Sequence, residues 1–514
     1  MGSALSLFEG VVVYMVETFT AGVIQSCQGQ EQQNVSLLQD QNPLEDFRTF
    51  DRNDEIFQEY DPPPGDDSKM GWKRSRPTRL MSLWKAMNCA FCIQILGGVA
   101  LGSLAILILI INFNTVDLCY DLQRSNWTSL PKRYQLIILT VATSEAYVIQ
   151  LWTFLVVLTM FDWSLIKKLN LLTLNLLCAF LDTCYRLYLQ VYGVYRSPWM
   201  PYPLNGLFVF MLVMNGFLIG REIANNSETE RKTRMKKAIK VSVILLSQFA
   251  FGLPITLSVV RVLIPLYGKV SETYRAIIAG ALPLVTAIPK VIVRLAAQRI
   301  GFLHPGDAHV LLIVLFSVSA IVFRVMQAEL NSLKLYIILS FAHGAIDLLE
   351  RLTIVIRDYV WYFIYKKLKR DKRETILKAN QFRSPRSMRF VADMSIQMIL
   401  GESTSLIAAV GVIQLYNFLY NGKDTSSEIT EFFKRVSIAL SIDFAFNSLS
   451  FWLQMSYMNV AVVRVWRKKW RKHMFIAFIL ITVTMFYFSG DFFFLVRAKN
   501  TSKATNCTEP FSKF

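Results

Sequence analysis

The chain has 514 residues, of which 53% are hydrophobic and 18% are charged, and its formal net charge is +18. This composition is too apolar for an ordinary soluble protein of this length and indicates a membrane protein. The basic residues form short clusters beside apolar runs, as the positive-inside rule and attraction to anionic lipid require, so we expect no nucleic-acid partner.

Residues 1–87 are expected to form a cytoplasmic tail that is mostly disordered, because from Gln28 onward they are polar, acidic and poor in aromatic residues. The opening MGSALS fits the myristoylation pattern and makes Gly2 a lipidation candidate. Residues 8–24 are apolar but contain Glu9 and Glu17 and lack a preceding basic segment. They predict an interfacial helix rather than a cleaved signal, with an additional span as the alternative.

Residues 88–496 contain a series of apolar runs long enough to cross a bilayer core of about 30 Å. We expect about eleven transmembrane helices in one bundle, and therefore an all-α polytopic integral membrane protein. The runs lie at 88–112, 135–160, 170–193, 203–220, 241–264, 276–296, 308–326, 335–356, 396–420, 436–462 and 474–496.

The distribution of basic residues orients the predicted helices. Six Lys or Arg residues precede the first run, which predicts a cytoplasmic amino terminus. With eleven spans, the segments assigned to the inner side carry 33 Lys or Arg and those assigned to the outer side carry 14. The tail at 497–514 is then external or lumenal, and the chain belongs to the secretory pathway, in the plasma membrane or an endomembrane.

Sequons and cysteines give a second check on this orientation. Asn126, Asn500 and Asn506 stand in glycosylation sequons on the predicted outer side. Cys119 and Cys507 also fall there and are candidates for a disulfide in an oxidising compartment.

Residues 357–395 are predicted to be a basic cytoplasmic loop. Its segment WYFIYKKLKR mixes aromatic and basic residues, as an interfacial helix on an anionic inner leaflet would. This lipid bilayer is the one partner that the sequence predicts, and the pattern indicates no particular solute and no oligomeric state.

The eighth run carries four ionisable residues at helical spacing. His343, Asp347, Glu350 and Arg351 share one face of a helix, and an ion at bilayer depth costs about 2.5–3.5 kcal/mol on insertion scales. The face must therefore point toward other helices or water. The further acids of the predicted polar interior are Glu145, Asp182, Glu402 and Asp443.

Prolines mark the fifth and sixth runs as possible gates. Pro254, Pro283 and Pro289 each remove a backbone hydrogen bond, and transporters often bind their substrate where a helix is broken. The alternative is a static kink. Lys290, which follows Pro289, could line a pore or extend to the inner headgroups.

These patterns favour a transporter or channel that moves a small solute, an ion or a lipid, with His343 and Asp347 exchanging a proton. One alternative is a lipid-modifying membrane enzyme that uses His343, or Asp117 and Asp121 at the lumenal face. Another is a multi-pass receptor or scaffold. With four histidines and no metal-type cysteine array, neither a metal nor a cofactor is expected, and the Cys89-x-x-Cys92 pair is interpreted as packing or palmitoylation.

Overall fold

The computed structural model describes the residues 78–115, 132–192, 199, 201–225, 231–298, 303–354, 357, 360, 385–420, 424–458 and 460–499. Within these residues all regular structure is helical and no strand occurs, which confirms the predicted all-α fold. The elements are α4 (Arg79–Phe91), η1 (Cys92–Val99), α5 (Ala100–Thr115), α7 (Lys132–Met160), α8 (Trp163–Lys168), α9 (Leu171–Val191), α10 (Pro201–Asn225), α11 (Arg231–Ser258), η3 (Val259–Leu263), α12 (Ile264–Lys269), α13 (Glu272–Gln298), α14 (Pro305–Ala308), α15 (Val310–Ala328), α16 (Leu333–Leu352), α18 (Pro385–Tyr420), α19 (Thr425–Tyr457) and α20 (Val462–Lys499).

Each predicted apolar run coincides with one helix or with one helical rod built from consecutive segments, such as α4, η1 and α5. Seven helices of the described chain are long and apolar enough to cross a membrane. They are the rods containing α4 and α5, α7, α10, α14 and α15, α18, α19, and α20. The other long helices, α9, α11, α13 and α16, fall outside this set.

Several helices begin earlier than the apolar pattern predicted. α18 starts at Pro385 rather than at residue 396, so the end of the predicted loop 357–395 is helical and buried, including Arg389 and Asp393. α20 starts at Val462 rather than at 474 and contains the basic segment 464–472. Hydropathy marks only the apolar part of a helix, whereas Lys and Arg continue it well. Several predictions lie outside the described residues, namely those for the tail 1–77, most of the loop 358–384, Gly2, residues 8–24, Asp117, Asp121, Asn126, Asn500, Asn506, Cys119 and Cys507.

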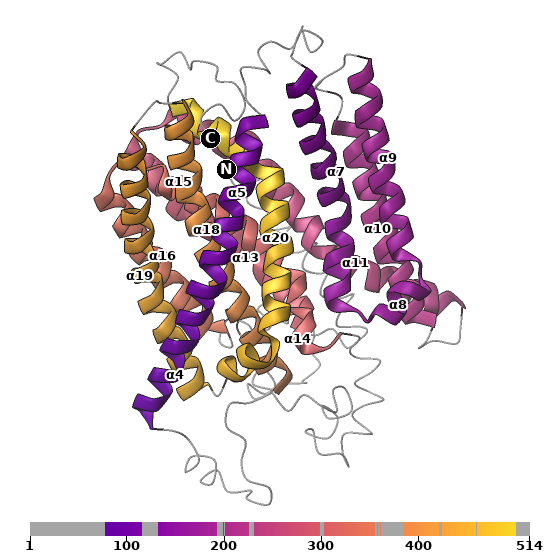
Figure 1. Cartoon of the computed structure of the whole chain (residues 1–514). Helices are drawn as coiled ribbons and strands as arrows, with labels where there is room; N and C mark the ends of the chain where they lie inside the picture. Colours follow the sequence, from indigo (N-terminus) through magenta and orange to yellow (C-terminus); the bar gives the residue numbers. More distant parts are fainter. Residues whose placement is uncertain are drawn as a thin grey trace, which may run out of the picture.

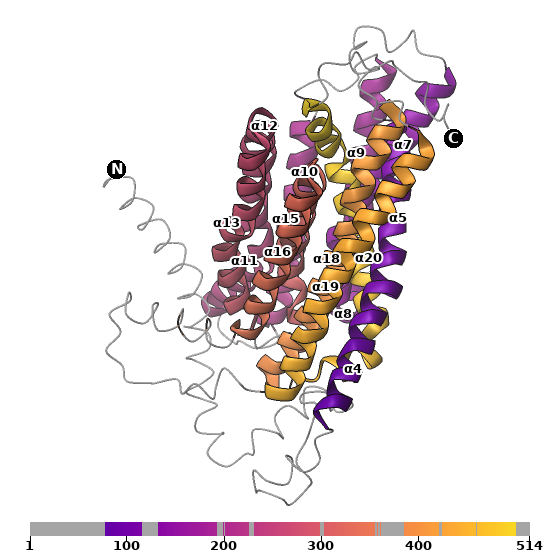
Figure 2. The ribbon, with the colours of Figure 1, turned by 90° about the vertical axis from the view of Figure 1, so that its left-hand side faces the viewer.

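α18 is the central helix of the bundle. It packs against α15, α19, α20 and the rod of η1 and α5, as Figures 1 and 2 show from two sides. In α18, 89% of the most apolar stretch is buried, against 33% in α7. Side chains on α18 therefore face protein on nearly every side, so polar groups there must find partners within the bundle.

Small residues allow the first rod to approach α18 closely. A Cβ atom on Gly98 would lie 2.7 Å from Cβ of Ser403, and one on Gly102 would lie 2.6 Å from Cγ2 of Ile407. Glycines four positions apart bring helix backbones together in membranes. The π-helical segment η1, which begins at Cys92, lies at this contact.

α7, α8, α9 and α10 form a lateral lobe, coloured violet to magenta at the right of Figure 1. α7 packs on α9 and α20, and α10 packs on α11, which in turn packs on α15. Asn170 turns the chain between α8 and α9 with φ of 50°, a left-handed conformation that asparagine tolerates better than most residues. The lobe thus contacts the core through α11 and α20.

Candidate functional site

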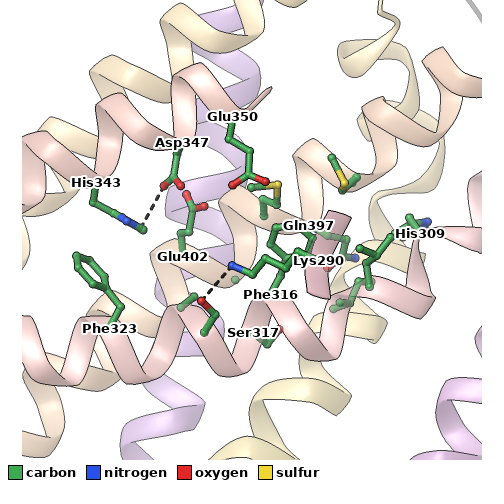
Figure 3. A pocket seen from close by; sticks show the side chains of 17 residues that line it. Lys290, His309, Phe316, Ser317, Phe323, His343, Asp347, Glu350, Gln397 and Glu402 are labelled. Atoms are coloured by element: carbon green, nitrogen blue, oxygen red, sulfur yellow. Dashed lines mark hydrogen bonds and ion pairs between the residues drawn. The ribbon is translucent and has the colours of Figure 1, made fainter. Parts of the chain in front are cut away.

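A cavity lies between α13, α15, α16 and α18, inside the bundle (Figure 3). Its volume of about 40 Å³ has room for roughly three water molecules, each of which needs about 10–15 Å³. The ionisable or amide side chains that line it are Lys290, His309, His343, Asp347, Glu350, Gln397 and Glu402. The site therefore combines several ionisable groups with little free space.

α16 supplies the histidine and two of the acids. Ser332 starts this helix by accepting a hydrogen bond from the amide of Leu335, and the following turns place His343 and Asp347 on the buried face. His343 Nε2 lies 3.1 Å from Asp347 Oδ2, yet neither imidazole nitrogen has a well-aligned hydrogen-bond partner among the described residues. The ring stacks on Phe323, with 4.3 Å between ring centroids.

Glu402 on α18 completes an acidic group with the α16 residues. One ligand atom each from His343, Asp347 and Glu402 lies within 4.8 Å of the others. Such a donor set can hold a proton or a cation. However, Arg351 Nη2 already lies 2.9 Å from Glu402 Oε2, and a second cation, Lys290, lines the same cavity. These positive charges oppose a resident divalent metal and favour proton chemistry.

Lys290 faces the acids from α13. Its Nζ donates to Ser319 Oγ at 3.0 Å and lies 4.7 Å from the centre of the Phe316 ring. Within the described part of the chain, no carboxylate lies within 4 Å of this ammonium group, although the side chain is buried. The sequence left open whether Lys290 lines a pore or extends to the headgroups, and the structure places it in the cavity.

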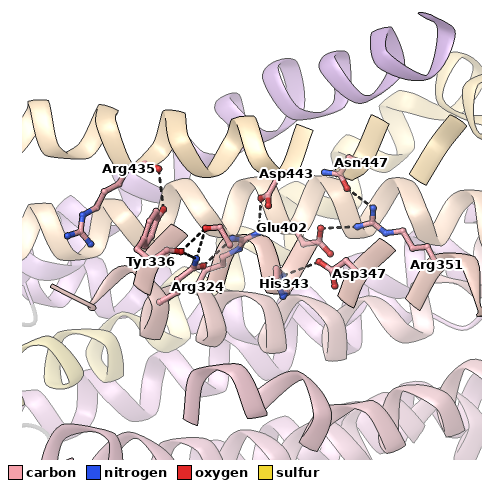
Figure 4. A network of polar contacts seen from close by, with 11 residues as sticks. Arg324, Tyr336, His343, Asp347, Arg351, Glu402, Arg435, Asp443 and Asn447 are labelled. Carbon is pink, nitrogen blue, oxygen red and sulfur yellow. Dashed lines mark hydrogen bonds and ion pairs between the residues drawn. The ribbon is translucent and has the colours of Figure 1, made fainter. Parts of the chain in front are cut away.

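Two buried arginines balance the acids beside the cavity (Figure 4). Arg324 Nη2 lies 2.7 Å from Asp443 Oδ2, and Arg351 donates both to Glu402 and, at 2.6 Å, to Asn447 Oδ1. Glu350 lies 3.9 Å from Arg294 and 3.4 Å from Arg357. Asp347 differs from them, since no Lys or Arg of the described residues lies within 4 Å of its carboxylate.

The structure therefore brings six of the eight predicted interior residues together: His343, Asp347, Glu350, Arg351, Glu402 and Asp443. The other two belong to the lateral lobe. Asp182 Oδ1 lies 2.7 Å from Arg186 Nε, and its second oxygen accepts from Gln150 at 2.7 Å. Glu145 is a half-buried residue of α7 and does not line the cavity.

The three prolines that were predicted as possible gates lie within helices. α13 continues through Pro283 and Pro289 and is not broken there, and a role of these prolines in gating stays a prediction. Pro254 is an exposed residue of α11, and the π-helical segment η3 begins five residues beyond it. Neighbouring helices stabilise a proline-containing helix, which explains its continuity. Neither Pro254 nor Pro289 lines the cavity.

A second buried polar cluster was missed by sequence reasoning. His473 Nε2 lies 3.1 Å from Asp393 Oδ1, whose other oxygen accepts from Arg389 at 2.6 Å. Gln397 donates to the backbone oxygen of His473 at 3.0 Å, and His309 lies beside His473 with 5.5 Å between ring centroids. The histidines stand at the edges of apolar runs, and only their shared position beside inner basic segments could have indicated a site.

No family model, no curated protein and no solved structure matches the chain.

Proposed function

We propose that this protein is a multi-pass membrane transporter or channel, with about eleven spans, a cytoplasmic amino terminus and an external or lumenal carboxyl terminus. The observation that carries the proposal is the cavity that Lys290, His343, Asp347, Glu350 and Glu402 line inside the helix bundle. Buried ions in a membrane are costly, and they commonly mark an ion or substrate pathway.

The cavity favours a small cation or a proton over a large solute. In this conformation its volume suits a few waters or one ion. The carboxylates of Asp347, Glu350 and Glu402 share the cavity with the ammonium group of Lys290, and Arg351 neutralises Glu402. The Asp347 carboxylate lies beside the His343 imidazole and near Glu402, with no Lys or Arg of the described residues within 4 Å, and is then the group best placed to bind and release a proton.

In this mechanism Asp347 alternates between a charged and a neutral form as a proton arrives and leaves. Lys290 supplies a positive charge in the same cavity as these carboxylates. His343, stacked on Phe323, is held beside Asp347 and accepts or returns the proton. Movement of α13 or α16 would open the cavity to either side in turn.

Flux measurements in reconstituted liposomes test the proposal. We expect wild-type protein to carry protons or a monovalent cation under an imposed gradient, and Asp347→Asn to lose most of that flux. Asp182→Asn, in the lateral lobe, is the matched control and keeps it. Wild-type vesicles that carry no proton, Na⁺, K⁺ or Cl⁻ flux above protein-free vesicles would reject this function.

One observation favours a second candidate. The His343 imidazole lies 3.1 Å from a carboxylate and borders a cavity within the apolar interior, an arrangement that a lipid-modifying enzyme could use as a general base. Under this reading, purified protein incubated with labelled acyl donors and lipids yields a modified lipid, and His343→Gln abolishes the product without any transport signal.

A further inference from the structure

The second buried cluster, formed by Arg389, Asp393 and Gln397 on α18, His473 on α20 and His309 at the start of α15, lies beside the cavity. His309 and Gln397 belong to both, because they also line the cavity (Figure 3). The two polar groups of the core are therefore contiguous. Burying a line of polar groups costs more free energy than burying apolar side chains, so this continuous polar region suggests a function.

His309 is the residue that joins them. It is fully buried, and neither of its ring nitrogens has a hydrogen-bond partner among the described residues. Burying an imidazole without a hydrogen-bond partner costs free energy of folding. Such a residue is explained if it forms hydrogen bonds only while the protein works. The charged and titratable groups that face it are Asp393 and Arg389 on α18 and His473 and Lys472 on α20, with Lys290 lining the same cavity from α13.

His473 is held in one orientation by its neighbours. Asp393 lies 3.1 Å from its Nε2, and the side-chain amide of Gln397 lies 3.0 Å from its Nδ1. A neutral imidazole satisfies both contacts when Nε2 donates to the carboxylate and Nδ1 accepts from the amide. Arg389, 2.6 Å from Asp393, keeps that carboxylate ionised and ready to stabilise an imidazolium.

The cluster also reaches the protein surface. Lys472, next to His473, forms an ion pair with Asp307 of α14, and both side chains are partly exposed. With a cytoplasmic amino terminus and eleven spans, residues 297–306 and 464–472, which precede His309 and His473 in the chain, fall on the cytoplasmic side, as does the predicted basic loop 357–395. The line of polar groups therefore runs from the predicted inner surface to the cavity.

We propose that His309 and His473 form a proton pathway between the cytoplasm and the cavity, an inference that rests on the proposed transport function. A proton from cytoplasmic water binds His473 beside Asp393. The N–H bond that it formed on the His473 ring then breaks, and the bonding electrons stay on that ring nitrogen as a lone pair. The proton forms a new N–H bond on a ring nitrogen of His309. His309 releases it to cavity water or to the Asp347 carboxylate, so one proton is transferred and no other bond changes.

The test measures protons themselves, with a pH-sensitive dye trapped in proteoliposomes and a K⁺ diffusion potential as the driving force. We expect His309→Gln and His473→Gln each to slow wild-type proton flux by roughly tenfold or more, the usual contribution of a positioned proton-transfer group. His304→Asn is the matched control. His304 caps α14 by accepting from the amide of Gly306, asparagine preserves that acceptor, and flux should stay within about twofold of wild type.

Chemical rescue separates proton transfer from a structural role. We expect imidazole added to vesicles of His309→Ala to restore part of the flux, because the truncated side chain leaves room for the free ring. A loss of flux that imidazole does not restore, together with a lowered thermal midpoint, would show that His309 only stabilises the fold and would overturn the inference.

Failure of this inference is distinguishable from failure of the proposed function. If Asp347→Asn abolishes proton flux while His309→Gln retains it, the pathway is rejected and the transport function stands. The same holds if the protein moves another ion but no protons. If wild-type protein moves none of the ions tested, both the pathway and the transport function are rejected.

Discussion

The lateral lobe and the core differ in how they compensate the charge of buried acids. Both contain acids within apolar helices, yet in the lobe Asp182 is neutralised by Arg186 on its own helix and accepts a hydrogen bond from Gln150 on the adjacent one. In the core, Asp347 faces Lys290 and Glu402 from other helices across free space. A buried acid whose carboxylate lacks a full set of hydrogen-bond and ion-pair partners and borders a cavity suggests a pathway. A buried acid whose carboxylate has all its partners suggests a role in helix packing.

Amide pairs make the same distinction. Asn175 on α9 and Asn215 on α10 donate to each other at 3.0 Å, which satisfies two facing polar groups without leaving space. Asn447 in the core instead accepts from Arg351, which also binds Glu402 next to the cavity. The lobe therefore uses polar groups to hold helices together, and the core uses them to fix charges around a site.

The largest expected effect on stability is in the core. Arg324→Met leaves Asp443 as a buried carboxylate without its partner at 2.7 Å, and the free energy of unfolding should fall by about 3–5 kcal/mol. Thermal unfolding of the detergent-purified protein measures this loss. The control is the double variant Arg324→Met with Asp443→Leu, which removes both charges and should recover most of the stability. Equal losses in the single and double variants would contradict the account of a compensated pair.

An intermediate effect is expected where the lobe meets α11. A Cβ atom on Gly220 of α10 would collide with the backbone oxygen of Ala238 and lie 2.6 Å from Ser242 Oγ. Gly220→Ala should therefore destabilise the protein by about 1–3 kcal/mol, since backbone atoms must move.

The same helix provides the matched control for that substitution. A Cβ atom on Gly206 would meet no other part of the described chain within 4 Å, so Gly206→Ala should leave stability unchanged or raise it by up to about 1 kcal/mol. A thermal midpoint lowered equally by both substitutions would refute close packing at Gly220.

The smallest effect is expected at the asparagine pair. Asn175→Leu removes the partner of Asn215 and should cost about 0.6–1.7 kcal/mol, the range for interhelical hydrogen bonds in membranes. Ion flux should stay at the wild-type level, because the pair does not line the cavity. Flux that falls in step with Asp347→Asn would show that the lobe takes part in transport after all.

Much of the fold could be predicted because hydropathy and helical spacing are local properties. The apolar runs gave the positions of the long helices, and the spacing of His343, Asp347 and Arg351 placed all three on the buried face of α16. The glycines at Gly98, Gly102 and Gly220 were not used in the sequence analysis, and the structure shows close helix contacts at all three.

The pairing of charges could not be predicted, because it depends on contacts between distant segments. Arg324 stands near the end of its apolar run, where an arginine usually reaches the headgroups, but the structure buries it against Asp443 far along the chain. His309 and His473 similarly lie at the edges of separate runs. The position of a residue within an apolar run does not reveal which other helix packs against that residue. The second cluster therefore became visible only in three dimensions.

Water accessibility tests the central claim that the core is wet and the lobe is dry. In a chain whose native cysteines are replaced by serine, Ser317→Cys places a thiol in the cavity wall, and Thr153→Cys places one in the buried interior of α7. We predict that Ag⁺, a thiol-reactive monovalent cation small enough for this cavity, modifies Ser317→Cys in functional vesicles and that Thr153→Cys stays unmodified. Modification of Thr153→Cys at an equal rate, or none at Ser317→Cys from either side of the membrane, would contradict the account.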